Sequence, residues 1–549
     1  MNTFEPGTSF EHTNPKSSLA ATEGADPAVT HVDSGEPELS SGALDTPPER
    51  NIIKRRILGI LIGLAVAVGF FFVLPADIGV WPRLTAATAL LMAIWWVTEA
   101  VPIPITSLLP LIIFPILVPP AENKGAAVSV DTIGASYGNN IIFLFMGGFM
   151  LAMAMQRWNL HRRIALKVLS VMGSKTSTLI GGFMIATGFI SMWVSNTATA
   201  VMMLPIGMSV LMLVSRVSAN GEEIVEGQPL KTNFGTAMML GIAYAASIGS
   251  LGTLIGTPPN ALLAGIMSRE YGLQIGFGQW MIVGVPISVI MMFIAWFLLT
   301  KVMFKPEIRE VPGGAELLRA EYAKLGPISS GEKRVAIIFA IAALAWVSIP
   351  LISQYLLGMS SAFISDAGIA VLVGLALFLM PSGTVKGVRL LNWETAVKMP
   401  WDVLLLFGGG LALSSQFSAS GLSTLLGQQV SGLADLPLIV IVLVVALAIL
   451  FLTEITSNTS TAATFLPVAT GIAVGIGVPP LMLAAPVALA ATCAFMLPVA
   501  TPPNAIAYST GQITIGQMVK GGLWLNIIGA LLITGVSMTL LVWVFGLGA

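Results

Sequence analysis

Two short polar strings each occur twice in this sequence, and their side chains could bind a small cation and an anion. Ser195-Asn196-Thr197 is repeated as Ser457-Asn458-Thr459, and Thr257-Pro258-Pro259-Asn260 is repeated as Thr501-Pro502-Pro503-Asn504. Hydroxyl and amide oxygens are neutral ligands that suit a small hard cation. A helix that breaks at such a string also frees carbonyl groups at one helix end and N–H groups at the other, which suit a cation and an anion respectively.

All four strings lie inside strongly apolar sequence, where polar groups are costly unless they line a cavity. A single Ser-Asn-Thr more often bonds to its own helix backbone or marks helix packing. Matching interruptions in two halves of a chain instead point to the binding site of a transporter. No Lys or Arg lies within the strings, so a bound anion would need neutralisation by helix ends, amides, hydroxyls and bound cations. The strings therefore predict coupling to a cation, and the absence of an aspartate favours sodium over a proton.

The two halves of the chain share their spacing. Gly148 precedes Asn196 by 48 residues, and Gly410 precedes Asn458 by the same number. Both glycines end similar strings, Phe145-Met146-Gly147-Gly148 and Phe407-Gly408-Gly409-Gly410. The later spacing, from each asparagine to the next Thr-Pro-Pro-Asn, is 18 residues longer in the first half, which matches a polar loop around 217–234. This pattern indicates an internal duplication with one loop insertion.

The composition indicates a protein solvated mostly by lipid. Of its 549 residues, 55% are hydrophobic and only 10% are charged, whereas a soluble protein carries about a quarter charged residues. The net charge of -1 gives no electrostatic case for binding nucleic acid. His12, His31 and His161 all lie outside the apolar runs, which excludes imidazole metal sites and histidine proton relays at membrane depth. The single cysteine, Cys493, lies in an apolar run and is expected to be a buried small residue.

Apolar runs of about 20 residues predict an all-α polytopic membrane protein. The expected spans are 57–75, 84–98, 101–118, 139–156, 238–267 (broken at 256–260), 279–303, 335–356, 363–380, 402–418, 481–510 (broken at 500–504) and 521–546. The paired prolines are expected to stop the helix at each break. Stretches 177–215 and 437–475 are interrupted at the Ser-Asn-Thr strings, so each is either two spans or a re-entrant hairpin.

Charge favours re-entrant hairpins at both stretches. Arg50, Lys54, Arg55 and Arg56 precede the first span and predict a cytoplasmic N-terminus. With two hairpins, the basic loops all fall inside and the loops without Lys or Arg fall outside. We therefore expect about 11 transmembrane helices plus two hairpins that enter from opposite faces, which makes the repeats inverted. The plasma (inner) membrane is the expected location.

A basic segment, 157–175, is expected to form a helix that lies in the membrane interface. Ile164, Val168 and Val171 fall on one face of that helix, whereas Arg163 and Lys167 fall elsewhere. A second polar segment, 1–50, is rich in Ser, Pro, Gly and acidic residues and is expected to be a disordered tail.

The segment Ser191-Met192-Trp193-Val194-Ser195-Asn196-Thr197-Ala198-Thr199-Ala200, together with the paired strings, closely resembles the divalent anion:sodium symporter family of INDY-type carboxylate transporters. The resemblance covers about residues 50–549. It implies a homodimer, a scaffold domain and a moving transport domain in each protomer, and elevator-type alternating access. The implied divisions are 1–50 (tail), 51–120 (scaffold spans), 121–304 (first repeat with hairpin and broken helix), 305–333 (cytoplasmic loop), 334–400 (scaffold spans of the second repeat) and 401–549 (second hairpin, broken helix and last span).

The same resemblance implies the residues of the site. The first sodium site would comprise Ser191, Ser195, Asn196 and the carbonyl of Gly256; the second would comprise Thr453, Thr456, Asn458 and the carbonyl of Ala500. The substrate carboxylates would contact Asn196, Thr197, Thr257 and Pro258 on one side, and Asn458, Thr459, Thr501 and Pro502 on the other. Two further roles follow from the residues alone. Asn260 and Asn504 are expected to cap or brace exposed backbone. Glu454, an acid in an apolar run, is either a functional residue or a brace of its hairpin, and the brace is preferred.

The function that the resemblance implies is sodium-coupled import of C4-dicarboxylates such as succinate, malate or fumarate, with Na+ as the coupling ion and no organic cofactor. The alternatives within transport are a sodium-coupled sulfate or citrate carrier and a sodium-independent dicarboxylate exchanger. A membrane enzyme would need a nucleophile–base pair or a metal cluster at depth, and the placement of the histidines argues against it. A channel would need a continuous pore.

Overall fold

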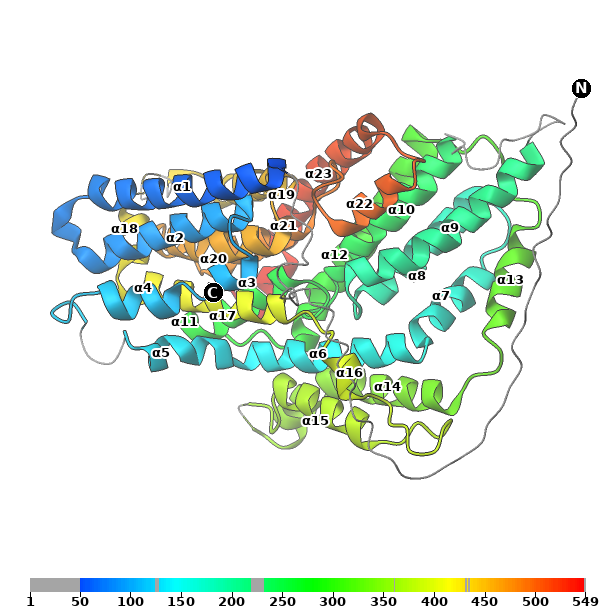
Figure 1. The fold of residues 1–549 in the computed structure, drawn as a ribbon, viewed down its shortest axis with the longest axis horizontal. Helices are drawn as coiled ribbons and strands as arrows, with labels where there is room; N and C mark the ends of the chain where they lie inside the picture. Colours follow the sequence, from blue (N-terminus) through cyan, green and yellow to red (C-terminus); the bar gives the residue numbers. More distant parts are fainter. Residues whose placement is uncertain are drawn as a thin grey trace, which may run out of the picture. The chain divides into compact units, whose positions relative to one another are not determined.

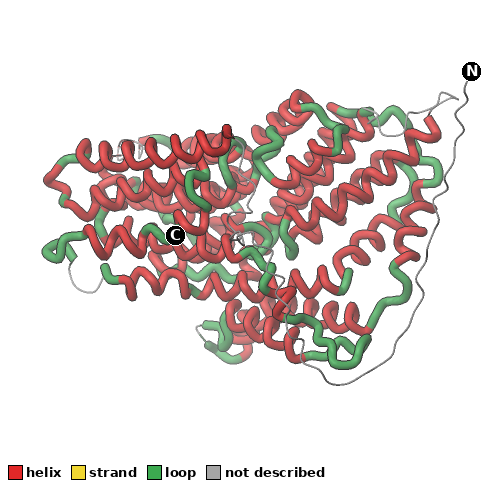
Figure 2. Tube along the Cα trace, viewed as in Figure 1, coloured by secondary structure: helices red, strands yellow, loops and turns green. Residues whose placement is uncertain are grey.

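The computed structural model describes residues 50–123, 128–218, 232–359, 361–429, 432 and 435–547. The acidic tail, except for Arg50, and most of the loop at 217–234 lie outside these residues. The described elements are all helices, and no β-strand occurs among them (Figure 2). Eight of the described helices are long and apolar enough to cross a membrane, and five shorter apolar helices accompany them. The predicted class, an all-α polytopic membrane protein, is confirmed; the number of spans stays a prediction.

The first segment of the chain forms α1 (Arg50–Val73), α2 (Val80–Thr98), α3 (Ile103–Thr106), α4 (Pro110–Leu117), α5 (Val130–Gly134) and α6 (Asn140–Arg157). The span predicted at 101–118 is therefore two short helices rather than one. Pro110 is the first residue of α4, a position where its missing N–H has no helical partner to lose. The intervening Ser107 carbonyl accepts a 2.5 Å hydrogen bond from the Tyr137 hydroxyl, so the break is satisfied internally.

Most of the remaining helices fall into two series, each of which contains one Ser-Asn-Thr and one Thr-Pro-Pro-Asn string. The first comprises α8 (Thr176–Ser191), α9 (Asn196–Ser218), α10 (Asn233–Ser250), α11 (Pro258–Tyr271) and α12 (Phe277–Phe297). The second comprises α17 (Trp401–Ala419), α18 (Leu422–Gln429), α19 (Leu438–Thr453), α20 (Asn458–Gly475), α21 (Leu481–Thr492), α22 (Pro502–Ser509), α23 (Ile515–Met538) and α24 (Leu540–Phe545). Between them lie α15 (Asp366–Leu379) and α16 (Trp393–Ala396). The helix pairs α8/α9 and α19/α20 each break at a Ser-Asn-Thr string, as the sequence predicts.

The broken helices interrupt earlier than predicted. The first is unwound over 251–257 instead of 256–260, and the second over 493–501 instead of 500–504. The expectation that the paired prolines stop the preceding helix is wrong. Pro258 and Pro502 instead begin α11 and α22, because a proline at the first helical position sacrifices no hydrogen bond and already has a helical φ angle.

Contacts between equivalent residues show how the two halves meet. Phe145 and Phe407 occupy equivalent places in the repeat, and their rings pack edge to face with centroids 4.9 Å apart. The broken helices also exchange partners: α11 packs on α20 and α21, and α22 packs on α9 and α10. In Figure 1, α8, α9 and α10 lie to the right of the view and α18 and α20 to the left. The direction in which each hairpin enters a membrane stays a prediction.

The basic helix α7 (Leu160–Ser170) differs from its prediction. Its buried face contains Leu160, Leu166, Leu169 and also Arg163, whereas Val171 is 70% exposed. The face that packs on the protein is therefore not the face of Ile164, Val168 and Val171, and it includes Arg163. The location of this helix in the membrane interface stays a prediction.

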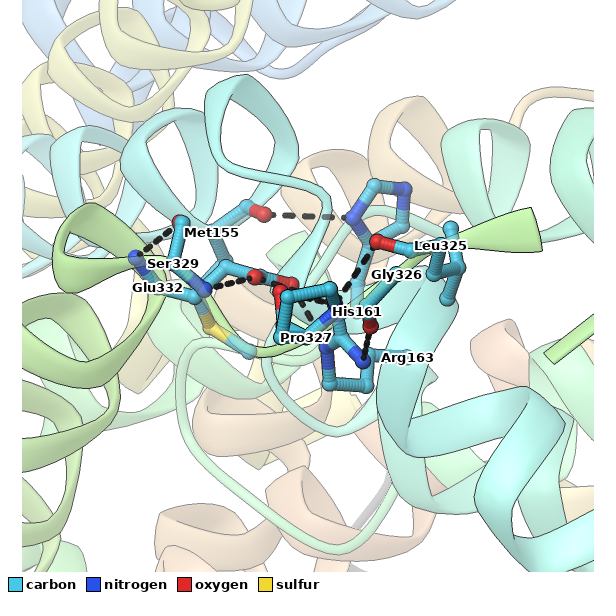
Figure 3. A network of polar contacts seen from close by, with 8 residues as sticks. All are labelled: Met155, His161, Arg163, Leu325, Gly326, Pro327, Ser329 and Glu332. Atoms are coloured by element: carbon cyan, nitrogen blue, oxygen red, sulfur yellow. Dashed lines mark hydrogen bonds and ion pairs between the residues drawn. The ribbon is translucent and has the colours of Figure 1, made fainter. Parts of the chain in front are cut away.

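A buried polar network explains the orientation of Arg163 (Figure 3). Its guanidinium donates to Glu332 of α14 (Ser330–Leu351) at 2.7 and 3.1 Å. It also donates to the carbonyls of Leu325 and Gly326, just after α13 (Gly314–Lys324), at 3.2 and 3.0 Å. The hydrogen bond to Glu332 raises the pKa of the Arg163 guanidinium. One cation thus joins α7, α13 and α14, which positions the helix that leads into α8.

Candidate functional site

At the break in the first hairpin, one hydroxyl group lies within hydrogen-bond distance of two acceptor oxygens. Ser191 ends α8 and Asn196 begins α9. The Ser191 hydroxyl lies 2.7 Å from Asn196 Oδ1 and 2.6 Å from the carbonyl oxygen of Ala246 in α10. Both partners are acceptors, and the hydroxyl has one proton to donate. The cluster therefore has an excess of lone pairs, which is the environment that a bound cation needs.

The second hairpin repeats this cluster with a threonine. Thr453 ends α19 and Asn458 begins α20. The Thr453 hydroxyl lies 2.8 Å from Asn458 Oδ1 and 3.0 Å from the carbonyl oxygen of Ala491 in α21. In each half, the hydroxyl stands five residues before the asparagine and bonds to the first part of the broken helix. This recurrence of geometry was not visible in the repeated strings, which contain neither hydroxyl.

The first broken helix is held at its break by side chains of the hairpin, of the unwound segment and of α11. Asn196 Nδ2 donates to Ser250 Oγ at 3.3 Å, and Thr253 donates to the carbonyl of Met192 at 2.6 Å. Asn260 Nδ2 donates to the carbonyl of Thr253 at 2.9 Å, which confirms the predicted brace. A Cβ atom at Gly256 would collide with the carbonyl of Ser250, so only glycine allows this close approach.

The second unwound segment is braced in a related way. Asn504 Nδ2 donates to the carbonyls of Ala494 and Leu497, both at 3.1 Å. The Thr501 hydroxyl caps α22 by accepting from the backbone N–H of Asn504 at 3.3 Å. Glu454 accepts backbone N–H groups from the same segment, as its predicted role as a brace requires.

Most of the predicted residues lie at helix ends, where the partial charge of the helix suits either an anion or a cation. Four helices begin at the repeated strings, at Asn196, Pro258, Asn458 and Pro502, and four end at Ser191, Ser250, Thr453 and Thr492. Helix N-termini carry partial positive charge and attract anions, whereas C-termini carry partial negative charge and attract cations. Thr197 and Thr459 are the second residues of α9 and α20, and Thr257 and Thr501 are the N-caps of α11 and α22. The predicted substrate residues thus lie at N-termini, and Ser191 and Thr453 lie at C-termini.

Exposure separates the predicted residues into three groups. The buried residues are Ser191, Gly256, Thr257, Thr453, Thr456, Ala500 and Thr501. Ser195, Thr197 and Pro502 are exposed, and Asn196, Pro258, Asn458 and Thr459 are partly buried. The two asparagines are therefore partly exposed, whereas Ser191 and Thr453, which they bond, are buried. Thr257 links the two halves, because its hydroxyl lies 3.4 Å from that of Thr492.

Several residues at this site were missed from the sequence. Ala246 and Ala491 contribute only carbonyl oxygens, which no side-chain pattern can indicate. Ser250 and Thr253 have no matching residues in the second repeat, so the comparison of strings could not select them. Among the described residues, no three His, Cys, Asp or Glu side chains form a metal cluster. A cation at this site would therefore be held by hydroxyl, amide and carbonyl oxygens, and the residues present fit sodium.

Comparisons with known proteins agree with this geometry. The chain matches the family described as the sodium:sulfate symporter transmembrane region over residues 54–547. It is 43% identical over 448 residues to the sodium-dependent dicarboxylate transporter SdcS of Staphylococcus saprophyticus, covering 81% of this chain and 84% of that protein. It is 41% identical over 480 residues to SdcS of Staphylococcus aureus strain USA300, covering 87% of this chain and 90% of that protein.

One solved structure supports the fold. The YdaH transporter of Alcanivorax borkumensis superimposes with a TM-score of 0.53 at 14% identity, over 84% of this chain and 100% of that chain. At that identity the likeness concerns the fold alone. Together with the family match over nearly all of residues 50–549, it agrees with the resemblance drawn from the repeated strings. The chain belongs to the sodium:sulfate symporter family, which confirms its predicted place among the divalent anion:sodium symporters as a multi-pass membrane transporter.

Proposed function

We propose that this protein is a sodium-coupled dicarboxylate transporter that imports C4-dicarboxylates such as succinate, malate or fumarate. The observation that carries the proposal is the oxygen cluster that occurs once in each half, where one hydroxyl proton faces an amide oxygen and a backbone carbonyl. The names of the relatives, sodium-dependent dicarboxylate transporters, support the same substrate class and coupling ion.

Each cluster would hold one Na+. In the first site, Ser191, Ser195, Asn196 and the carbonyl of Gly256 are the proposed ligands. In the second, Thr453, Thr456, Asn458 and the carbonyl of Ala500 take these roles. Sodium supplies the positive charge that a dicarboxylate requires, since no Lys or Arg lies in any of the four strings. Neither site is assigned an organic cofactor.

The substrate would bind at the partly positive helix N-termini on the open side of the clusters. One carboxylate would contact Asn196, Thr197, Thr257 and Pro258, and the other would contact Asn458, Thr459, Thr501 and Pro502. Each asparagine would then serve a cation through Oδ1 and a carboxylate through Nδ2. Sodium binding and substrate binding should accordingly strengthen each other, and this coupling must be reciprocal.

Transport would proceed by elevator-type alternating access in a homodimer with cytoplasmic N-termini. The exchanged packing of the broken helices on the hairpins of the opposite half supports a transport domain that moves as one body. The family description also covers sulfate, so sulfate is the competing substrate to test.

Uptake of radiolabelled succinate by proteoliposomes tests the proposal. An inward sodium gradient should drive accumulation, and a choline gradient of the same size should not. Excess unlabelled malate or fumarate should compete with succinate, whereas sulfate should not. Equal uptake in sodium and choline would contradict the coupling and favour the exchanger, and competition by sulfate alone would move the protein to sulfate transport.

A further inference from the structure

Each hairpin is hydrogen-bonded to the unwound segment of the broken helix in its own half, but the groups that make these bonds differ between the halves. Glu454 stands four residues before Asn458 and is 3% exposed. The equivalent position in the first half, four residues before Asn196, is Met192. The internal duplication therefore placed a carboxylate in one half and a thioether in the other, at the same point of the hairpin.

Backbone and amide donors surround the Glu454 carboxylate. Its Oε1 accepts from the N–H groups of Phe495 and Met496 at 2.7 and 3.0 Å. Its Oε2 accepts from Met496 and Leu497 at 2.9 and 3.1 Å. Asn526 Nδ2 donates to Oε1 at 2.7 Å. Every partner is a donor, which is the arrangement that an ionised carboxylate needs.

The Glu454 carboxylate has no basic partner in the described part of the chain. Buried charges in proteins are normally paired with an opposite charge or coordinate a metal. The neighbouring residue, Thr453, belongs to the oxygen cluster proposed for the second Na+, so a cation bound there would be the missing opposite charge.

The first half makes the same tie without a charge. The Thr253 hydroxyl of the unwound segment donates to the carbonyl of Met192 at 2.6 Å. This bond joins hairpin and broken helix at the place where Glu454 joins them in the second half. The residue that follows the cluster hydroxyl is therefore Met192 in the first half and the acid Glu454 in the second.

We propose that Glu454 makes the two cation sites unequal, so that the second site binds sodium more tightly than the first. The carboxylate holds the unwound segment 493–501, which carries the Ala500 carbonyl, and it attracts the cation through a low-dielectric interior. Glu454 is thus a positioning residue for ion binding. This inference rests on the proposed sodium coupling.

Glu454→Gln is the direct test, because it keeps the size of the side chain and removes its charge. The sodium concentration for half-maximal succinate uptake should rise on the order of fivefold or more, a typical range for coupled sites. The substrate KM at saturating sodium should change much less. Thr253→Val is the matched control, since it removes the neutral tie of the first half without changing charge, and its sodium dependence should change less than that of the Glu454 variant.

A second pair of variants decides the matter if Glu454→Gln fails to fold. Ser191→Ala and Thr453→Ala each remove one small hydroxyl from one cluster and leave Glu454 in place. Sodium-induced thermal stabilisation of the purified variants should require a higher sodium concentration for Thr453→Ala than for Ser191→Ala, because only the former damages the tighter site. Equal or reversed sodium requirements would overturn the proposal.

The outcomes separate this inference from the proposed function. If wild-type uptake does not respond to sodium, the function itself is wrong. If wild-type uptake responds to sodium but folded Glu454→Gln has the same sodium requirement, the coupling stands and the inequality of the sites is refuted.

Discussion

Asn196 is the residue at which a small substitution should have the largest effect on transport. In the structure its amide makes two hydrogen bonds, one from Ser191 and one to Ser250. Asn196→Ala leaves the Ser191 hydroxyl bonded to the Ala246 carbonyl, so no donor in the cluster is orphaned. The loss of two neutral hydrogen bonds should lower the free energy of unfolding by about 1–2 kcal/mol, and the protein should still fold and insert.

The effect on function should be much greater, because the amide is proposed to contact two charged ligands. A hydrogen bond to a charged group is worth about 1.5–3 kcal/mol, which corresponds to a factor of roughly 10 to 150 in affinity. Losing such a contact to both the cation and the carboxylate should nearly abolish uptake. Binding of succinate by the purified variant, measured by calorimetry in sodium chloride, should be weakened by at least the lower factor.

Asn196→Asp is the matched control for this prediction. It keeps the oxygen that faces Ser191 and replaces the amide donor with a negatively charged oxygen. Sodium-induced thermal stabilisation should be retained or increased, while succinate binding should be lost through charge repulsion. Normal uptake by a folded, inserted Asn196→Ala variant would refute the proposed double role, and so would undiminished succinate binding by Asn196→Asp.

Three further predictions follow from the packing and from charge. Gly256→Ala should abolish sodium-dependent uptake without preventing expression, because its methyl group would displace the carbonyl at the end of α10; normal uptake would show that this close approach is dispensable. Arg163→Ala should lower the free energy of unfolding by about 3 kcal/mol, the cost of orphaning a buried partner, and should lower the thermal midpoint of purified protein; an unchanged midpoint would contradict the role of Figure 3's network. In a Cys493→Ala background, an impermeant thiol reagent should label Ala323→Cys only from the cytoplasm and Ala419→Cys only from outside, and labelling of both from one side would break the inverted topology.

The sequence predicted the helices well where hydrophobic length decides the outcome. The interrupted stretches and the broken spans were all found, because a polar string in apolar sequence has few structural explanations. The exact breaks were missed because proline was taken as a terminator. Pro258 and Pro502 in fact begin helices, and the backbone had already unwound several residues earlier, where Asn260 and Asn504 hold its free carbonyls.

The candidate site was predictable only in its side chains. Carbonyl oxygens from Ala246 and Ala491 complete the two clusters, and an alanine gives no signal in a sequence. Helical spacing separated Arg163 from the face of Ile164, Val168 and Val171 but gave no sign that its side chain is buried. Its burial depends on Glu332, which is 169 residues away in the chain, and no local pattern could have paired the two.

The packing of the broken helices bears on how such a site could face two sides of a membrane. The broken-helix segment α11 packs on the hairpin helix α20, and α22 packs on the hairpin helix α9. Opening either hairpin alone would therefore remove packing contacts from the broken helix of the other half. The Thr257 and Thr492 hydroxyls, 3.4 Å apart, lie where one unwound segment meets the start of the other. A local gate at one hairpin would therefore disturb both oxygen clusters together. Movement of the two hairpins and both broken helices as one unit would leave the clusters intact, and for this reason we propose a moving transport domain rather than a hinged lid.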